Sequence, residues 1–318
     1  MKRKSVSYAK WGYIFMLPFF VVYIIFSLYP LIQTFYNSFF DYVIDRGKLG
    51  GFGQTAQKAN ETIKFCGLDN YINIFSKEET LVQSFLNTVI MWIVGFIPQI
   101  AVSLLLATWF TDLRLKIKAQ GFFKTVIYLP NVIMASAVAF MFTSLLQKGG
   151  SLFNATSWMA GGDLSILDTV WGTRGVIGFI NFLLWYGNTT ILLMAAIMGI
   201  DPTLYESAQI DGATPSQIFW RITMPLIRPI LSFVLVTSMI GGLQMYDVPA
   251  LLTKDQGNPV GKALTIIMEV QLRKDSGVGK ASAVCISIFI VSAILGIILM
   301  FGMNDDKPKK KKKKRRTA

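Results

Sequence analysis

Long uncharged stretches recur along the chain and form its most obvious pattern. Six runs without Asp, Glu, Lys or Arg hold most of the apolar side chains, at residues 11–40, 80–111, 125–147, 175–200, 229–246 and 281–304. A helix needs about 20 residues to cross roughly 30 Å of hydrocarbon. With flanking residues included, the pattern predicts transmembrane helices at about 11–40, 80–111, 122–147, 175–200, 224–250 and 281–303.

The composition favours membrane helices over the alternatives. The chain is 53% hydrophobic and 15% charged, against about 25% charged residues in soluble domains. A soluble helical protein rarely needs so many long uncharged runs, and the strands of a membrane β-barrel alternate apolar and polar positions, whereas residues 191–197 are apolar on every face. We therefore predict an all-α, polytopic membrane protein with six transmembrane helices in one domain, residues 1–318.

The distribution of Lys and Arg predicts the orientation, because positive residues favour the cytoplasmic side. With the N-terminus inside, the inner segments hold more Lys and Arg than the outer ones, largely through residues 2–4 and 307–316. Both termini are therefore expected in the cytoplasm. Residues 304–318 are expected to form a basic, disordered tail, either simply solvated or attracted to anionic membrane lipids, with nucleic-acid binding the weaker interpretation.

The chain lacks residues on which many enzymes depend. It has no His, and its two cysteines, Cys66 and Cys285, lie far apart in the sequence. This excludes a disulfide framework, His-based catalysis and Cys/His metal sites. The Gly-Lys pairs within 257–262 and 277–280 lack the spacing of a phosphate-binding loop. We expect no catalytic residue, no metal and no cofactor on this chain, so ATP must bind elsewhere.

The segment between the fourth and fifth predicted spans, residues 201–221, reads as two short helices. Asp201 can cap the first helix, with proline following at the first helical position. Gly212 supplies the left-handed turn that ends it. Thr214 and Gln217 have the spacing of a capping box that opens the second helix. A bent helix pair of this kind would form a compact projection on the cytoplasmic side.

The surface of this projection suits a protein partner. Ala208, Gly212 and Ala213 are small, so a neighbouring protein could approach the backbone closely, while Glu206 and Asp211 offer carboxylates. The alternative is an amphipathic helix lying on the membrane. Two acidic residues beside an anionic leaflet make that alternative less favourable.

The same segment carries a family resemblance. The order Glu206-Ser207-Ala208, then Gly212, then Ile222 to Pro225 resembles the EAA motif of permeases in ATP-binding-cassette (ABC) importers. The sequence departs from that motif at Ser207 and at Met224, which stands in place of a leucine. Other segments resemble the binding-protein-dependent sugar permeases of the maltose and glycerol-phosphate type, at residues 13–18, 26–30, 38–39, 67–71, 122–130 and 246–253.

The resemblance implies a function and a set of partners. The chain would be one of two permeases, in a heterodimer, that form the path for a sugar or oligosaccharide. Two separate ATPase subunits would bind ATP and Mg, an extracytoplasmic binding protein would deliver the sugar, and the complex would lie in a prokaryotic plasma membrane among its lipids. Residues 201–221 would dock in the ATPase, and the residues implied in this coupling are Glu206, Ser207, Ala208, Asp211, Gly212, Ala213, Ile222 and Pro225.

A sugar path through a membrane needs hydrogen-bonding groups for hydroxyls and aromatic faces for the ring, because unsatisfied polar groups are costly there. The first candidates are Gly241, Gln244, Tyr246 and Asp247, where paired glycines loosen the fifth span. The second are Trp185, Tyr186 and Asn188, and the third are Asn131 and Ser136. The alternative for each is hydrogen bonding between helices or close packing at glycine.

An ion-coupled secondary transporter of a small polar solute is the main competing function. Such proteins usually show titratable relays or repeated broken helices. Here only Asp247 lies at span depth, without an evident partner in the sequence. A channel or membrane scaffold is a third possibility, and neither explains the projection at residues 201–221.

Overall fold

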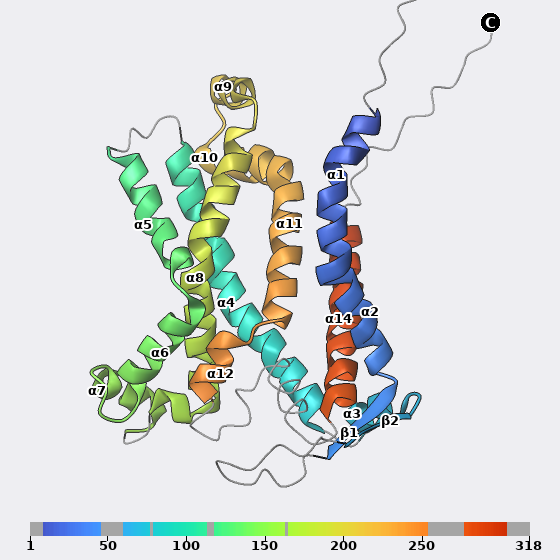
Figure 1. Ribbon diagram of the computed structural model, residues 1–318. Helices are drawn as coiled ribbons and strands as arrows, with labels where there is room; N and C mark the ends of the chain where they lie inside the picture. Colours follow the sequence, from blue (N-terminus) through green and yellow to red (C-terminus); the bar gives the residue numbers. More distant parts are fainter. Residues whose placement is uncertain are drawn as a thin grey trace, which may run out of the picture. The chain divides into compact units, whose positions relative to one another are not determined.

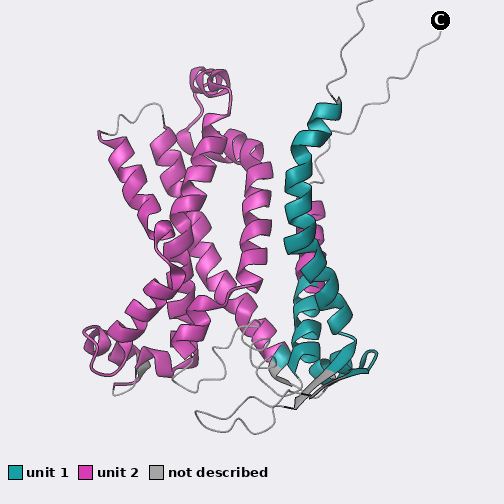
Figure 2. Cartoon of the chain, viewed as in Figure 1, with its two compact units in different colours: residues 1–81, 267–289 teal, residues 82–266, 290–318 magenta. Residues whose placement is uncertain are grey.

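The computed structural model describes residues 9–45, 60–76, 79–112, 118–162, 165–253 and 277–303. Two compact units divide the chain: unit 1 comprises Met1–Leu81 and Ile267–Phe289, and unit 2 comprises Val82–Ile266 and Ile290–Ala318 (Figure 2). Each unit draws on two separate parts of the sequence. The single domain expected over residues 1–318 stays a prediction, and the basic tail at 304–318 lies outside the described residues.

Unit 1 combines helices with a small sheet. Its elements are α1 (Ala9–Tyr23), η1 (Ile24–Leu28), α2 (Tyr29–Asn37), β1 (Phe40–Asp45), β2 (Asn60–Phe65), α3 (Asp69–Ser76) and the first half of α14 (Gly277–Met303). The strands pair antiparallel, from Phe40 opposite Phe65 to Asp45 opposite Asn60. The first span predicted at 11–40 is therefore too long, because the helix ends at Asn37 and a strand follows. These two strands form the sheet that the structure describes.

Hydrogen bonds fix the point where the helix gives way to the strand. The amide Nδ2 of Asn70, which is buried, donates to the carbonyls of Ser38 at 3.0 Å and Phe40 at 3.1 Å. The hydroxyl of Tyr71 donates to Ser38 Oγ at 2.7 Å. A Cβ on Gly279 would lie 1.9 Å from the Phe40 carbonyl oxygen, so only glycine fits there. These contacts tie β1 to α3 and α14.

Two short π-helical turns precede prolines. The segment η1 ends two residues before Pro30, and η4 (Phe219–Thr223) ends two residues before Pro225. Proline has no N–H to donate, and its ring crowds the carbonyl four residues earlier. A wider, π-helical turn makes room for the proline ring and leaves the carbonyl that would have accepted its N–H with a different donor. The helices therefore continue through prolines that the sequence alone marks as disturbances.

Unit 2 is a bundle of long and broken helices (Figure 1). It holds α4 (Glu79–Thr111) from Val82 onward and the second half of α14. Its other elements are α5 (Gln120–Val132), α6 (Ala135–Leu146), α7 (Phe153–Ser157), η2 (Trp158–Ala160), η3 (Ile166–Asp168), α8 (Val170–Met198), α9 (Pro202–Ile210), α10 (Pro215–Ile218), η4, α11 (Met224–Leu243) and α12 (Asp247–Thr253).

Five helical segments among the described residues are long and apolar enough to span a membrane: Lys10–Asn37, Leu81–Thr111, Val170–Met198, Pro215–Thr253 and Gly277–Gly302. The third predicted span, 122–147, is not one straight helix. It is the pair α5 and α6, bent by 84°. The expected six spans thus correspond to five long helical segments and one bent pair.

The bend in this pair is held by contacts with α8. Ile133 and Met134 adopt extended backbone angles between the two helices. The Nδ2 of Asn131 donates to the Leu184 carbonyl at 3.0 Å. A Cβ on Gly187 would lie 2.1 Å from the Ile127 carbonyl oxygen, so this glycine permits backbone contact between α5 and α8. The break therefore depends on packing against α8, which the sequence of residues 122–147 alone does not reveal.

A second break interrupts the predicted fifth span. The helix α11 ends at Leu243, and α12 starts at Asp247. The short helix α12 packs against α6 and α8, so the two segments that follow the breaks lie side by side (Figure 1). Repeated broken helices were expected to be usual in a secondary transporter, and their apparent lack in this sequence counted against that function. Their presence here corrects that expectation, and the feature no longer separates the two functions.

Two apolar clusters form the core of unit 2. The first joins α4, α6, α8 and α12 and consists of Met91, Val138, Ala139, Leu146, Leu167, Ile177, Ile180, Leu184, Val248 and Leu252. The second joins α4, α8 and α11 and consists of Ala107, Leu193, Met194, Ile197 and Ile227. The helices α4 and α8 contribute to both clusters.

Candidate functional site: a polar pocket and an exposed helical turn

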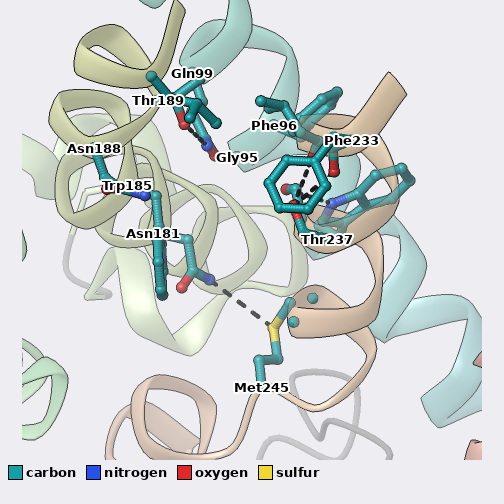
Figure 3. A pocket seen from close by; sticks show the side chains of 16 residues that line it. Gly95, Phe96, Gln99, Asn181, Trp185, Asn188, Thr189, Phe233, Thr237 and Met245 are labelled. Carbon is teal, nitrogen blue, oxygen red and sulfur yellow. Dashed lines mark hydrogen bonds between the residues drawn. The ribbon is translucent and has the colours of Figure 1, made fainter. Parts of the chain in front are cut away.

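A pocket of about 380 Å³ lies in unit 2, among α4, α8 and α11 (Figure 3). We call it the central pocket. Its lining consists of Trp92, Gly95, Phe96, Gln99, Asn181, Trp185, Asn188, Thr189, Leu192, Phe233, Val234, Thr237, Ser238, Gly241, Gly242 and Met245. Four members are aromatic and six carry amides or hydroxyls. None is charged, so the pocket offers ring faces and neutral hydrogen-bonding groups.

The aromatic wall on α4 is fixed by α11. The indole Nε1 of Trp92 donates to Ser238 Oγ at 3.1 Å. The Trp92 ring stacks on Phe96, with centroids 5.3 Å apart and planes 22° apart. A Cβ on Gly242 would lie 2.4 Å from Trp92 Cδ1, whereas a Cβ on Gly241 would meet nothing within 4 Å. Gly242 therefore permits the position of the indole.

The polar wall on α8 is less constrained. The Nε2 of Gln99 donates to Thr189 Oγ1 at 2.7 Å, linking α4 to α8. The Nδ2 of Asn181 points to the sulfur of Met245 at 3.9 Å (Figure 3), and a thioether is a weak acceptor. Among the described residues, Asn188 has no hydrogen-bond partner. Two amides are thus available to a ligand in the pocket.

Within the described ranges, no group of three or more His, Cys, Asp or Glu residues is placed to hold an ion. The lining of the central pocket offers only neutral oxygens, nitrogens and one thioether. The pocket is therefore suited to a neutral organic ligand.

The structure brings some of the predicted path residues into this pocket and leaves others outside. Trp185, Asn188 and Gly241 line it. Tyr186 lies outside the lining and stacks on Phe182 at 5.3 Å. The exposed residues at the break between α11 and α12 also lie outside it, namely Gln244, Tyr246 and Asp247.

The third set of predicted residues belongs to the bend between α5 and α6. Asn131 bonds to α8 as described above, and Ser136 lies in the first turn of α6. Neither residue lines the central pocket. Their positions fit the alternative interpretation, hydrogen bonding and packing between helices.

The pocket residues on α4 were not predicted from the sequence. Trp92, Phe96 and Gln99 follow one another at spacings of four and three, so they share one face of a helix. That spacing is the signal that could have indicated them. Asn181 was also missed, although it lies one turn before Trp185 on the same face.

The segment 201–221 shows the local structure that its sequence predicts. Asp201 Oδ1 accepts a hydrogen bond from the Thr203 N–H at 3.0 Å, and this bond lowers the pKa of the Asp201 carboxyl. Gly212 has φ of +75°. Thr214 and Gln217 form the capping box, with bonds of 2.8 Å and 3.3 Å. The predictions of both caps and of the left-handed turn are confirmed.

The turn after α9 projects from the end of unit 2 (Figure 1). Glu206, Ser207, Asp211 and Gly212 are exposed, and Ala208 and Ala213 are half-buried. Ile210 is 86% exposed. These residues form one continuous exposed turn.

Contacts with the start of the fifth span support this turn from behind. The hydroxyls of Tyr205 and Thr223 lie 3.2 Å apart, joining α9 to η4. Ile222 lies in η4 and is half-buried, and Pro225 lies at the start of α11 and is exposed. These two motif residues therefore belong to the support and not to the turn itself.

Comparison with known proteins gives the family. A model described as "Binding-protein-dependent transport system inner membrane component" matches residues 13–308. The chain belongs to this family. Membership confirms the resemblance drawn from the EAA-like motif, and it makes the chain a multi-pass permease subunit of an ABC importer. The family's transport subunits work with binding proteins and do not hydrolyse ATP themselves.

Relatives within the family cover almost the whole chain. The lactose transport permease LacF of Rhizobium radiobacter is 27% identical over 304 residues, covering 93% of this chain and 95% of that protein. The permease GgtC of Synechocystis, named for osmoprotective compounds, is 30% identical over 285 residues, covering 86% and 92%. These two permeases therefore align with most of this chain.

Solved structures share the fold. A chain of a bacterial ABC transporter that imports the acidic polysaccharide alginate superposes with a TM-score of 0.73 at 22% identity, covering 93% of this chain and 95% of that one. The same kind of transporter, in complex with a periplasmic protein holding an alginate pentasaccharide, gives a TM-score of 0.69 at 23% identity. At this identity the match shows the fold of an importer permease.

Proposed function

We propose that this permease pairs with a second, different permease to form the path of a neutral saccharide, and that the central pocket is a saccharide site on that path. The observation that carries the proposal is the lining of the pocket. Four aromatic side chains stand beside amides and hydroxyls, and no lining residue is charged.

The chemistry of this lining suits a sugar. Aromatic faces cover the apolar faces of a pyranose, while amides such as Asn181 and Asn188 can both donate to and accept from hydroxyls. The volume lies in the range of small-molecule sites. Relatives are named for lactose, for multiple sugars and for arabinooligosaccharides, which supports the substrate class.

The absence of charge in the lining favours neutral sugars. A carboxylate taken out of water needs a cation or several donors, because burying an unpaired charge is costly. The lining offers no Lys or Arg. A uronate would therefore bind less well than a neutral sugar of the same size.

The exposed turn at residues 206–213 supports the second half of the proposal, that the segment 201–221 docks in an ATPase subunit. Small residues there admit a close approach, Ile210 offers an apolar contact, and Glu206 and Asp211 offer carboxylates. Two ATPase subunits would bind ATP and Mg and would drive the change between outward- and inward-facing states. An extracytoplasmic binding protein would deliver the sugar.

The proposed setting follows from the same assembly. The complex would lie in a prokaryotic plasma membrane among its lipids, with both termini of this chain in the cytoplasm. No nucleic acid takes part.

The experiment is reconstitution of this chain in proteoliposomes with its co-encoded permease, ATPase and binding protein. We expect ATP hydrolysis to rise when the binding protein carries its sugar, and labelled sugar to accumulate only with ATP inside. Uptake by this chain alone, driven by a proton or sodium gradient, would instead establish the secondary transporter. ATP-driven uptake of a charged solute, with no uptake of neutral sugars, would refute the role given to the central pocket.

A further inference from the structure

A buried arginine, Arg174, belongs neither to the central pocket nor to the segment 201–221. Arg174, near the start of α8, is 9% exposed, and Asn87 of α4 is 0% exposed. An Arg174 terminal nitrogen donates to Asn87 Oδ1. The guanidinium carbon lies 4.8 Å from the centre of the Trp171 ring. Both side chains belong to unit 2.

This pair presents two donors without an acceptor. Arg174 Nε and Asn87 Nδ2 are both buried and make no hydrogen bond within the structure. Among the residues that the structure describes, no carboxylate forms an ion pair with Arg174. A buried cation without a counter-charge strongly destabilises a fold. Both orphan groups are donors, and an anion supplies the acceptors that they lack.

The pair is separate from the central pocket. Arg174 precedes Asn181 by seven residues, so it lies about two helical turns away on the same face of α8. Met91 and Ile177 of the first apolar cluster follow the pair by about one turn on α4 and α8. Apolar side chains thus intervene between this pair and the pocket, and neither Arg174 nor Asn87 lines it.

We propose that Arg174 and Asn87 bind a small monovalent anion, a halide or a carboxylate no larger than formate, which links α4 to α8. The positive charge and the two donors define an anion site. The near-complete burial limits its occupant to a small ion, and the Trp171 ring covers one face of the guanidinium. The anion would therefore approach in the guanidinium plane, toward Nε. The proposal does not depend on the saccharide or on the ATPase.

The test is thermal unfolding of the purified complex containing the full chain. It is performed in detergent at constant ionic strength, with chloride, bromide or formate replacing gluconate. A ligand that binds only the folded state raises stability with the logarithm of its concentration. We expect Tm to rise by about 2–4 °C between gluconate and saturating chloride, with bromide and formate acting alike. Gluconate and sulfate are too large or too strongly hydrated to replace them.

Two substitutions test whether the chloride-dependent rise in Tm arises at Arg174 and Asn87. Asn87→Asp puts a carboxylate beside Arg174 in a side chain of the same shape. It should abolish the chloride response and raise Tm in gluconate to at least the value of the wild type in chloride. Arg174→Gln should abolish the response as well. Lys148→Gln removes an exposed positive charge from the loop after α6 and should keep the full response.

Clear outcomes would overturn the proposal. Equal Tm values for the wild type in chloride and gluconate would show that no small anion binds in the folded state. A chloride response that persists in Asn87→Asp would place the site elsewhere. Stabilisation by an acidic saccharide but not by chloride would assign the arginine to a substrate. If Arg174→Gln fails to fold, the Asn87→Asp result still decides, and a result with chloride, bromide or formate does not depend on sugar uptake.

Discussion

The central pocket and the segment 201–221 both contain polar groups, yet these groups are held in opposite ways. In the segment, the bonds of Asp201 and Thr214 reach two or three residues along the chain. In the pocket, Trp92 bonds to a residue 146 positions away, and Gln99 to one 90 positions away. The segment is thus a local structure exposed to partners, whereas the pocket exists only when three helices are packed.

This difference implies different responses to mutation. A change in the segment should alter the coupling to ATP and leave the membrane helices intact. A change in the pocket should alter both helix packing and the fit of a sugar. The following substitutions test that distinction.

The largest effect is expected from Gly212→Val. Gly212 has φ of +75°, and a β-branched residue in this region costs about 1–2 kcal/mol or more, so the turn should be displaced. We expect uptake in the reconstituted complex to fall by at least about tenfold, while membrane insertion is unchanged. Gly212→Asn is the control, because Asn tolerates the left-handed region. Equal uptake for both variants and the wild type would contradict the docking role.

Gly242→Ala should act through Trp92. The new methyl would collide with the indole, and overpacking of this kind costs about 1–3 kcal/mol, so the ring should move into the pocket. We expect the concentration for half-maximal uptake to rise about tenfold, with a change in tryptophan fluorescence. Gly241→Ala, on the same turn, places its methyl group in open space, so it should leave the tryptophan fluorescence unchanged. A fluorescence change without an uptake change would separate the indole from the substrate path.

Trp185→Ala removes one aromatic face and leaves the glycine contacts intact. The ring is half exposed in the pocket wall, so its loss should weaken sugar binding with little effect on the fold. We expect about a fivefold loss of affinity, equivalent to roughly 1 kcal/mol of ring stacking. Trp185→Phe should restore most of it. Binding is measured by the sugar concentration that stimulates uptake, and an unchanged value in Trp185→Ala would place the sugar elsewhere.

The smallest effect concerns the cap at Asp201. The hydrogen bond from Thr203 lowers the pKa of this carboxyl. The charged cap therefore stabilises α9 at any pH above the ordinary Asp pKa, and this stabilisation is lost as the pH falls through the lower pKa of the folded state. Coupling should therefore be constant between about pH 5 and 8. Asp201→Asn keeps the cap, and Asp201→Ala should modestly increase proteolysis of the segment at neutral pH. Equal proteolysis of all three proteins would show that the cap does not hold α9.

Local features were accessible from the sequence. The uncharged runs indicated where membrane helices lie, because a helix in hydrocarbon must be apolar over its length. The caps at Asp201 and Thr214 and the left-handed turn at Gly212 could be predicted, because each depends on residues within one helical turn. These predictions needed no knowledge of neighbours in space.

Features set by distant contacts were not accessible. The bend between α5 and α6 depends on Gly187 and Asn131 meeting across helices. The strand after α2 depends on Asn70 and Gly279. A quarter of the residues that line the central pocket come from α4. Their spacing places Trp92, Phe96 and Gln99 on one face of the helix, but it does not tell whether that face meets a pocket, lipid or another helix.

The sequence by itself determined the class of this protein, its apolar segments and the turn that faces the ATPase in the proposed assembly, because solubility in a membrane and helix capping are properties of adjacent residues. Only the tertiary structure decided which polar side chains meet. Trp92 with Ser238, and Arg174 with Asn87, are brought together by packing between helices. No short-range rule relates residues that far apart in the chain.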